Sequence, residues 1–151
     1  MLIFVSLAVL ILDQVSKYLV KSHLAEFESI PIILNVFHLT YVNNSGAAFS
    51  LLRGRTSFFI IVTLLAMFLA VYFYFRVEKK WVLLRLGIAL AIGGALGNLI
   101  DRVRFGQVVD FFDFRIWPVF NIADCAVVVG VLLICWQLLR MDMADDKEKV
   151  K

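Results

Sequence analysis

The stretch WVLLRLGIALAIGGALGNLIDR, from Trp81 to Arg102, decides the fold. Its apolar part has the length of about 20 residues that is needed to cross the hydrocarbon core of a bilayer. Backbone groups at that depth must pair within their own segment, so a helix is predicted over about 81–100. Small residues recur in it at helical spacing, which is typical of close helix packing. They are Gly93 and Gly97, which form a GxxxG motif, and Gly87, Ala91 and Ala95.

Three further apolar segments lie on either side of this stretch, at about 1–21, 57–75 and 120–139. Hydrophobic residues make up 62% of the 151 residues and charged residues 18%, and the mean hydropathy is +0.91. A soluble domain, with about half of its residues apolar, could not bury so much apolar surface. The sequence therefore predicts an all-α integral membrane protein, a bundle of four transmembrane helices in a single domain over 1–151.

The distribution of charge sets the expected orientation in the membrane. Basic residues cluster in the turn 76–80 and in the tail after residue 140, and the net charge is +3. Short segments rich in Lys and Arg stay in the cytoplasm, which places both termini there and residues 22–55 and 101–119 outside. These groups indicate a membrane surface and not a nucleic-acid partner. The tail, about 141–151, has mixed charges without apolar periodicity and is expected to be disordered.

The first outer segment predicts a small β element between the first two helices. Residues 30–42 are rich in β-branched and aromatic side chains, and Phe37, Leu39 and Tyr41 alternate with their neighbours. Such alternation is typical of a strand with two different faces. Pro31 is expected at an edge or at the start of the sheet, because proline lacks the N–H group that a central strand needs.

Ionisable residues inside predicted helices are the first candidates for function, since each costs about 2.5–3.5 kcal/mol at a helix centre on insertion scales. Asp13 and Lys17 stand four residues apart on the first helix, so they share a face. They could be a self-neutralising pair that positions the helix, or they could act in catalysis, and both interpretations stay open. On the third helix, Asp101 beside Arg102 has the character of an interfacial anchor. Asn98, one turn deeper, is harder to explain in this way.

Two further aspartates suggest a chemical reaction. Asp110 lies inside the apolar run VVDF (108–111), where a polar group needs a partner. Asp124 opens the fourth helix three residues after Asn121, so a capping box is its structural explanation. Two carboxylates that approach each other share a proton, and one pKa rises. Such a pair can activate water and protonate a leaving amine, which is amide hydrolysis without a nucleophilic side chain.

Competing chemistries have less support. His23 and His38 lie apart in sequence from any cysteine or carboxylate cluster, so no metal site is predicted. Ser16 and Lys17 are adjacent on a helix and point about 100° apart, which disfavours a Ser/Lys hydrolase. The two cysteines would be about 15 Å apart on one helix and cannot bridge within the chain, so their redox state stays open.

At these residues the sequence resembles the lipoprotein signal peptidase family, also called signal peptidase II, over nearly the whole chain. The matching segments, in the family's order, are residues 13–17 (DQVSK), 44–50 (NSGAAFS), 93–102 (GGALGNLIDR), 108–111 (VVDF) and 120–124 (FNIAD).

The resemblance implies an aspartic peptidase of the bacterial inner membrane, with its site toward the outer face. It would cut a prolipoprotein just before a cysteine that carries diacylglycerol, without a cofactor and as a monomer in membrane lipid. Asp110 and Asp124 match the catalytic dyad. The polar positions that line the site and hold the substrate or the dyad are matched by Asp13, Lys17, Asn44, Gly46, Asn98, Asp101, Arg102 and Asn121.

The resemblance also extends to two outer features. Residues 22–55 are similar to the family's surface β element, and the loop between Asp110 and Pro118 to its mobile flap. The two aspartates are only 14 positions apart (124 minus 110), which predicts a short flap. Cys125 stands where the family commonly has a serine, a near-isosteric exchange.

Other classes of protein would also place charges inside helices. A small transporter would use them and GxxxG packing too, but it should line a path through the membrane with them. Here Asp101, Asp110 and Asp124 gather toward one side of the predicted bundle, which favours a site. A lipid-binding or assembly protein would tolerate the loss of either aspartate.

Overall fold

The computed structural model describes residues 1–46 and 54–149, with side chains described as far as residue 143. Within these residues the chain forms four helices and three strands. They are, in chain order, α1 (Leu2–His23), β1 (Ser29–Ile33), β2 (Phe37–Asn44), α2 (Thr56–Arg76), α3 (Val82–Phe105), β3 (Val108–Asp113) and α4 (Ile122–Lys149). Residues 47–50 of the motif 44–50 and the last two residues of the tail lie outside the described part.

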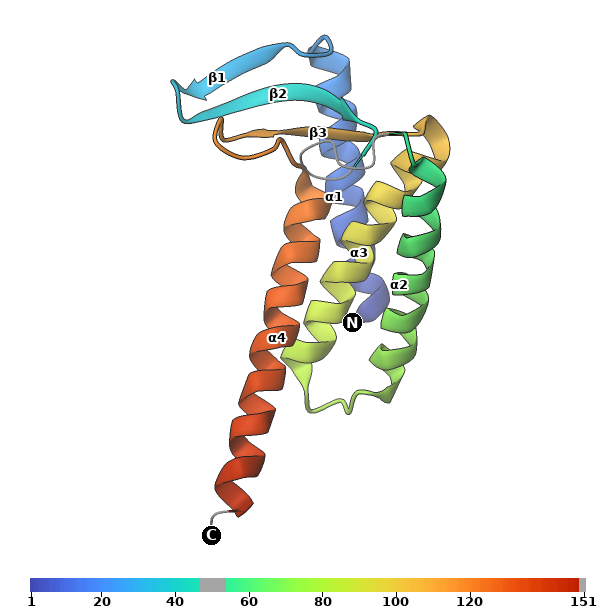
Figure 1. The fold of residues 1–151 in the computed structure, drawn as a ribbon, viewed down its shortest axis with the longest axis vertical. Helices are drawn as coiled ribbons and strands as arrows, with labels where there is room; N and C mark the ends of the chain where they lie inside the picture. The colour runs from blue at the N-terminus through green and yellow to red at the C-terminus, as the bar shows by residue number, and fades with distance from the viewer. Residues whose placement is uncertain (47–53, 150–151) are drawn as a thin grey trace.

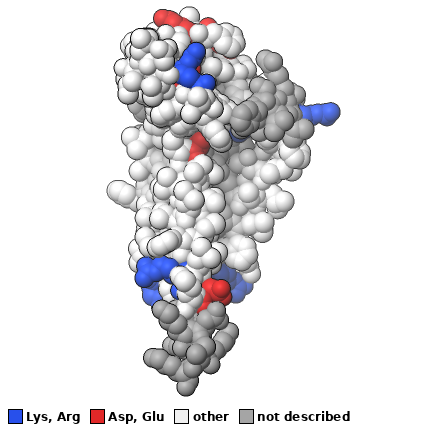
Figure 2. Space-filling model, turned by 60° about the vertical axis from the view of Figure 1, so that its left-hand side comes forward, with Lys and Arg blue, Asp and Glu red and all other residues white. Residues whose placement is uncertain are grey.

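The helices run side by side and the sheet lies at one end of the bundle (Figure 1). Each of the four helices found in the described residues is long and apolar enough to cross a membrane, which confirms the predicted class. On the face shown in Figure 2, charged groups gather toward the two ends of the molecule. The surface between them is nearly uncharged apart from one small acidic area below the sheet end, as expected for a surface in contact with lipid.

Helix α3 packs against α1, α2 and α4, and its glycines allow the close approach of α1 and α4. A Cβ atom added at Gly87 would lie 2.6 Å from the carbonyl oxygen of Gly130 on α4, and one at Gly93 would lie 2.9 Å from Cα of Ser6 on α1. A Cβ atom at Gly97 would collide with the carboxylate of Asp13. The small-residue pattern therefore does what the sequence predicted, and it also brings a polar group of α1 against α3.

The sheet is antiparallel with the order β1-β2-β3. β1 is an edge strand and contains Pro31, in agreement with the expectation for that residue. The described sheet contains a third strand, β3, where a loop was expected from Asp110 onward. Val42 on β2 lies opposite Asp110 on β3, so the central strand joins the two outer segments and fixes Asp110 in a ladder.

Two helix ends differ from the expected ones. α3 continues past residue 100 to Phe105, because no helix-breaking residue occurs before Gly106, which adopts the left-handed conformation (φ 75°) that ends many helices. The tail was expected to be disordered, and this is wrong for residues 141–149, which continue α4. Their sequence is rich in helix formers, and extending an existing helix avoids the cost of nucleation.

Candidate active site

Asp110 projects from β3 into a nearly closed polar environment, with 3% of its surface exposed. Its Oδ1 accepts a hydrogen bond of 2.7 Å from Nδ2 of Asn121, and its Oδ2 accepts one of 2.9 Å from Nδ2 of Asn44. Burial, together with the nearby charge of Asp124, raises the pKa of Asp110 to about 7, although the two amide hydrogen bonds act in the opposite direction. Asp110 can therefore hold a proton near neutral pH.

Asp124 lies in the first turn of α4 and forms the expected capping box. Its backbone N–H donates to Oδ1 of Asn121 at 2.9 Å, and its Oδ2 accepts the backbone N–H of Asn121 at 3.2 Å. Its Oδ1 accepts a further hydrogen bond of 2.8 Å from Nδ2 of Asn98. Asp124 can therefore cap α4 and also belong to a site. Asn121 forms the capping box through its backbone N–H and Oδ1, and it binds Asp110 through its Nδ2.

Both aspartates line one cavity of about 520 Å³. Its other walls come from α2, α3 and α4 and include Val62, Ala95 and Val127. A second cavity of about 560 Å³ lies on the sheet side, and Asp110 belongs to its wall as well. Asp110 therefore lies where an apolar space between helices meets a more polar space beside the sheet.

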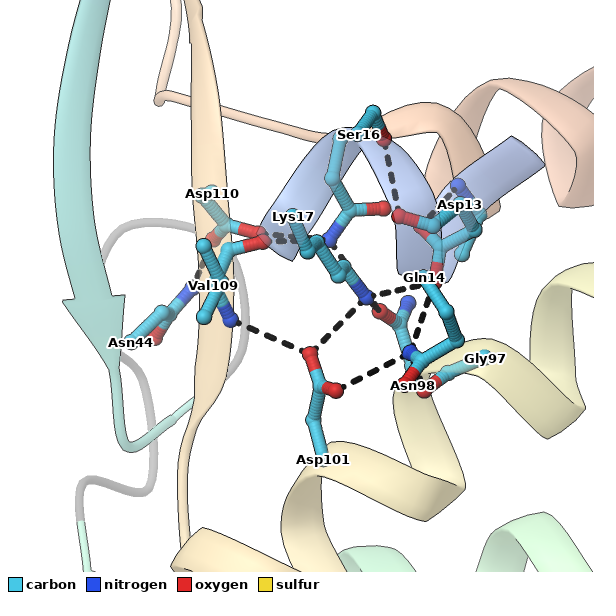
Figure 3. Close-up of polar contacts among 12 residues, drawn as sticks. Asp13, Gln14, Ser16, Lys17, Asn44, Gly97, Asn98, Asp101, Val109 and Asp110 are labelled. Atoms are coloured by element: carbon cyan, nitrogen blue, oxygen red, sulfur yellow. Dashed lines mark hydrogen bonds and ion pairs between the residues drawn. The ribbon is translucent and has the colours of Figure 1, made fainter. Parts of the chain in front are cut away.

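Lys17 is the centre of a buried ionic cluster that it forms with Asp13, Asp101 and Asn98 (Figure 3). Its Nζ lies 2.8 Å from Asp13, 2.9 Å from Asp101 and 3.0 Å from Oδ1 of Asn98. Only 3% of Lys17 is exposed, so its three N–H groups are used within the protein. Asn98 connects this cluster to Asp124, because its Nδ2 donates a hydrogen bond to that carboxylate.

Asp13 shows why the pair on α1 matters for the site. Its Oδ1 accepts the backbone N–H of Ala123 at 3.0 Å, which is one of the free donors at the start of α4. Asp13 thereby ties α1 to the helix end that carries Asp124. The self-neutralising pair considered for Asp13 and Lys17 is present, and it also reaches α3 and α4.

Gly46 and Arg102 connect to the site through Asn44. The N–H group of Gly46 donates to Oδ1 of Asn44 at 2.9 Å, and its carbonyl oxygen accepts a hydrogen bond of 3.3 Å from Arg102. The guanidinium group of Arg102 lies over the ring of Phe59, 5.0 Å from its centre. The structure thus brings all ten site residues predicted from the sequence into one connected region.

Two parts of this region are not among the site residues predicted from the sequence. Gln14 donates to Asp101 at 3.1 Å and to Asp13 at 3.2 Å, and its signal was an amide side chain beside Asp13 in an apolar helix. Asp113 accepts hydrogen bonds from Thr40 and Arg115 at the outer end of β3. Its signal was a second aspartate in the same apolar run, three residues after Asp110.

Comparison with known proteins identifies the class and then the family. A solved structure described as a bacterial membrane enzyme superposes with a TM-score of 0.87 at 38% sequence identity, and the match covers 92% of this chain and 87% of that chain. The family model described as signal peptidase (SPase) II matches residues 5–140. The chain therefore belongs to the signal peptidase II family and is a membrane peptidase.

Individual relatives agree with this family. The lipoprotein signal peptidase of Moorella thermoacetica is 55% identical over 139 residues, which cover 91% of each chain. That of Halothermothrix orenii is 52% identical over 147 residues, which cover 97% of this chain and 100% of the relative.

Proposed function

We propose that this chain is an intramembrane aspartic endopeptidase that removes the signal peptide from bacterial prolipoproteins. The family and the names of its relatives support the substrate class. The single observation that carries the mechanism is the convergence of Asp110 and Asp124 on one cavity, with Asn121 bound to both. The arrangement lies at the sheet end of the bundle, which is the outer side if the basic α2–α3 turn is cytoplasmic.

The proposed reaction needs one proton shared by the two carboxylates. The ionised member takes a proton from a water molecule as the water attacks the carbonyl carbon, and the protonated member supplies a proton to the leaving nitrogen. The C–N bond breaks, the new carboxyl end belongs to the signal peptide, and the mature chain keeps the free amine. No covalent intermediate with the protein forms.

The apolar cavity suits the lipid part of the proposed substrate. Its walls on α2, α3 and α4 run along the membrane-spanning segments, so acyl chains could enter from the bilayer while the peptide bond stays beside the aspartates. Binding of the acyl chains away from the reacting atoms would then orient the peptide bond and raise the rate. The bond cleaved would be the one just before the diacylglyceryl-modified cysteine.

A transporter fits the structure less well. Among the residues whose side chains are described, the buried acidic and basic ones are Asp13, Lys17, Asp101, Asp110 and Asp113. They belong to β3, to the middle and the following turn of α1 and to the sheet end of α3, and do not form a row along the whole bundle axis. This clustering supports a site at one surface over a path across the membrane.

The purified chain in detergent should cleave a diacylglyceryl-modified precursor and leave the matching unmodified precursor uncut. The reason is that the lipid part supplies the binding energy that orients the peptide bond. Product masses measured over time would give both the rate and the bond that is cut. Equal cleavage of both precursors would contradict the proposed role of the lipid, and cleavage of neither by folded protein would contradict the function itself.

Cleavage should also decline as the pH rises through about 7, where Asp110 loses its proton. Because the pKa of Asp110 is raised, its proton is present below that pH and absent above it, and the site then lacks the proton that the leaving nitrogen needs. The measurement is kcat/KM across the neutral range, which reports ionisations of the free enzyme. Asn44→Ala removes a hydrogen bond that lowers the pKa of Asp110, so it should move the decline to higher pH. A decline at the same pH in this variant would mean that another group titrates.

A further inference from the structure

The cavity on the sheet side has no assigned role in the scheme above. It has a volume of about 560 Å³ and lies between the end of β2 and the loop that follows β3. It shares Asn44, Asp110 and residues 117–119 with the apolar cavity, so the two cavities adjoin beside Asp110 and a chain that passes this carboxylate can extend into it. Its lining includes the charged side chain of Arg115, which comes from the loop after β3 and does not line the apolar cavity.

Arg115 is held in a backbone conformation that a residue with a side chain seldom adopts. Its φ is +64°, in the left-handed region. Its backbone N–H donates to Oδ1 of Asp113 at 2.8 Å, and its Nη1 donates to Oδ2 of the same carboxylate at 2.8 Å. Strained backbone of this kind persists where the surroundings fix it, and it is often found at binding sites.

The residues that hold Arg115 in place belong to the sheet. Asp113 is 5% exposed and also accepts a hydrogen bond of 2.8 Å from Oγ1 of Thr40 on β2, which in turn pairs with Oγ of Ser29 on β1 at 2.8 Å. Burial alone would raise the pKa of Asp113, but the hydrogen bonds from Thr40 and Arg115 and the charge of Arg115 outweigh it and hold this pKa below its ordinary value. The carboxylate is therefore ionised near neutral pH and anchors Arg115 from two positions.

The guanidinium group of Arg115 keeps binding capacity after this contact. Its side chain is 49% exposed, and among the described residues Asp113 is its hydrogen-bonding partner through Nη1. A guanidinium group has five N–H donors, so donors on Nη2 and Nε can face the cavity. Because Asp113 neutralises the positive charge, the group suits uncharged acceptors such as peptide carbonyl oxygens better than an anion.

We infer that the sheet-side cavity binds the segment of the substrate that follows the cleaved bond, and that Arg115 holds this segment through its backbone carbonyl oxygens. This inference rests on the proposed function. Asp113 then serves as a positioning residue that acts through Arg115. Recognition through the backbone would accept mature chains of different sequence, as a processing enzyme with many substrates requires.

The test compares two diacylglyceryl-modified substrates, one with several residues after the modified cysteine and one that ends at that cysteine as an amide. Arg115→Gln should raise KM for the long substrate about tenfold, the effect of losing about one hydrogen bond to a charged donor, with kcat nearly unchanged. It should leave KM for the short substrate as in the wild type. Asp113→Asn should act in the same direction, and the double variant should add little to Arg115→Gln.

Two further variants separate binding from folding. Arg115→Gly adopts the left-handed conformation without strain, so it keeps the loop and loses only the side chain, and it should reproduce the length-dependent rise in KM. Arg104→Gln removes an exposed arginine that lies over Phe105 at the end of α3, outside this cavity, and should change neither KM. An equal rise in KM for both substrates, or no rise in either Arg115 variant, would overturn the inference while the proposed function stands. Cleavage of neither substrate by the wild type would overturn both.

Discussion

Asp124→Asn and Asp110→Asn should each reduce cleavage of a lipidated precursor by about 1,000-fold or more, within the range that positioned acid–base groups contribute. An amide can neither take the proton of the attacking water nor give a proton to the leaving nitrogen. In the structure, each carboxylate receives amide donors on both oxygens, from Asn44 and Asn121 at Asp110 and from Asn98 and Asn121 at Asp124. Only a group whose two oxygens both accept can satisfy these donors. In an asparagine variant the side-chain NH2 group would face one of the N–H donors and could not accept its hydrogen bond.

The comparison must separate lost chemistry from lost folding. Each variant should be checked by its unfolding midpoint in detergent and by retention of helix content, because the capping box at Asp124 contributes to helix α4. Cys125→Ser is a matched control beside Asp124, since it changes a half-buried neighbour to a side chain of similar size. Full activity in either aspartate variant would exclude the dyad mechanism.

The helices were predictable because their signal is local. A continuous apolar run such as 82–100 has one stable form in a membrane, and Gly93 and Gly97 mark its packing face without any knowledge of the partner. The helical conformation of the tail after residue 140 was not predictable in this way. Mixed charges without apolar periodicity occur in disordered tails and also at the end of a long helix such as α4.

Strand β3 was not predictable from its own residues, because it exists through pairing with β2 some 70 positions earlier, as in the pair Val42 and Asp110 (110 minus 42 is 68). Spacing along a sequence does not encode such long-range pairing. For the same reason the sequence could suggest that Asp110 needs a partner but could not name Asn44 and Asn121 as the donors. Family resemblance supplied those positions, and the structure gives the hydrogen bonds that connect them.

The role of Lys17 was open between positioning and direct catalysis, and the two interpretations predict different results for Lys17→Met. Methionine has a similar length and no charge, so it would leave Asp13 and Asp101, which are 0% and 2% exposed, without their shared cation. Removing one partner of a buried ion pair costs about 3–5 kcal/mol. We therefore expect a large loss of stability against denaturant in detergent, together with a loss of activity because Asn98 no longer holds Asp124 firmly.

Lys21→Met is the matched control, since Lys21 lies one turn further along α1, is exposed and covers the ring of Phe105 at 4.2 Å. It should change stability by less than about 1 kcal/mol, as is usual for an exposed charge. Adding Asp13→Asn to Lys17→Met should restore part of the lost stability, because asparagine removes an unpaired charge and its Oδ1 can still accept the N–H of Ala123. Stability equal to that of Lys21→Met with activity abolished would instead mean that Lys17 acts on the substrate, and the buried cluster would have to open during turnover.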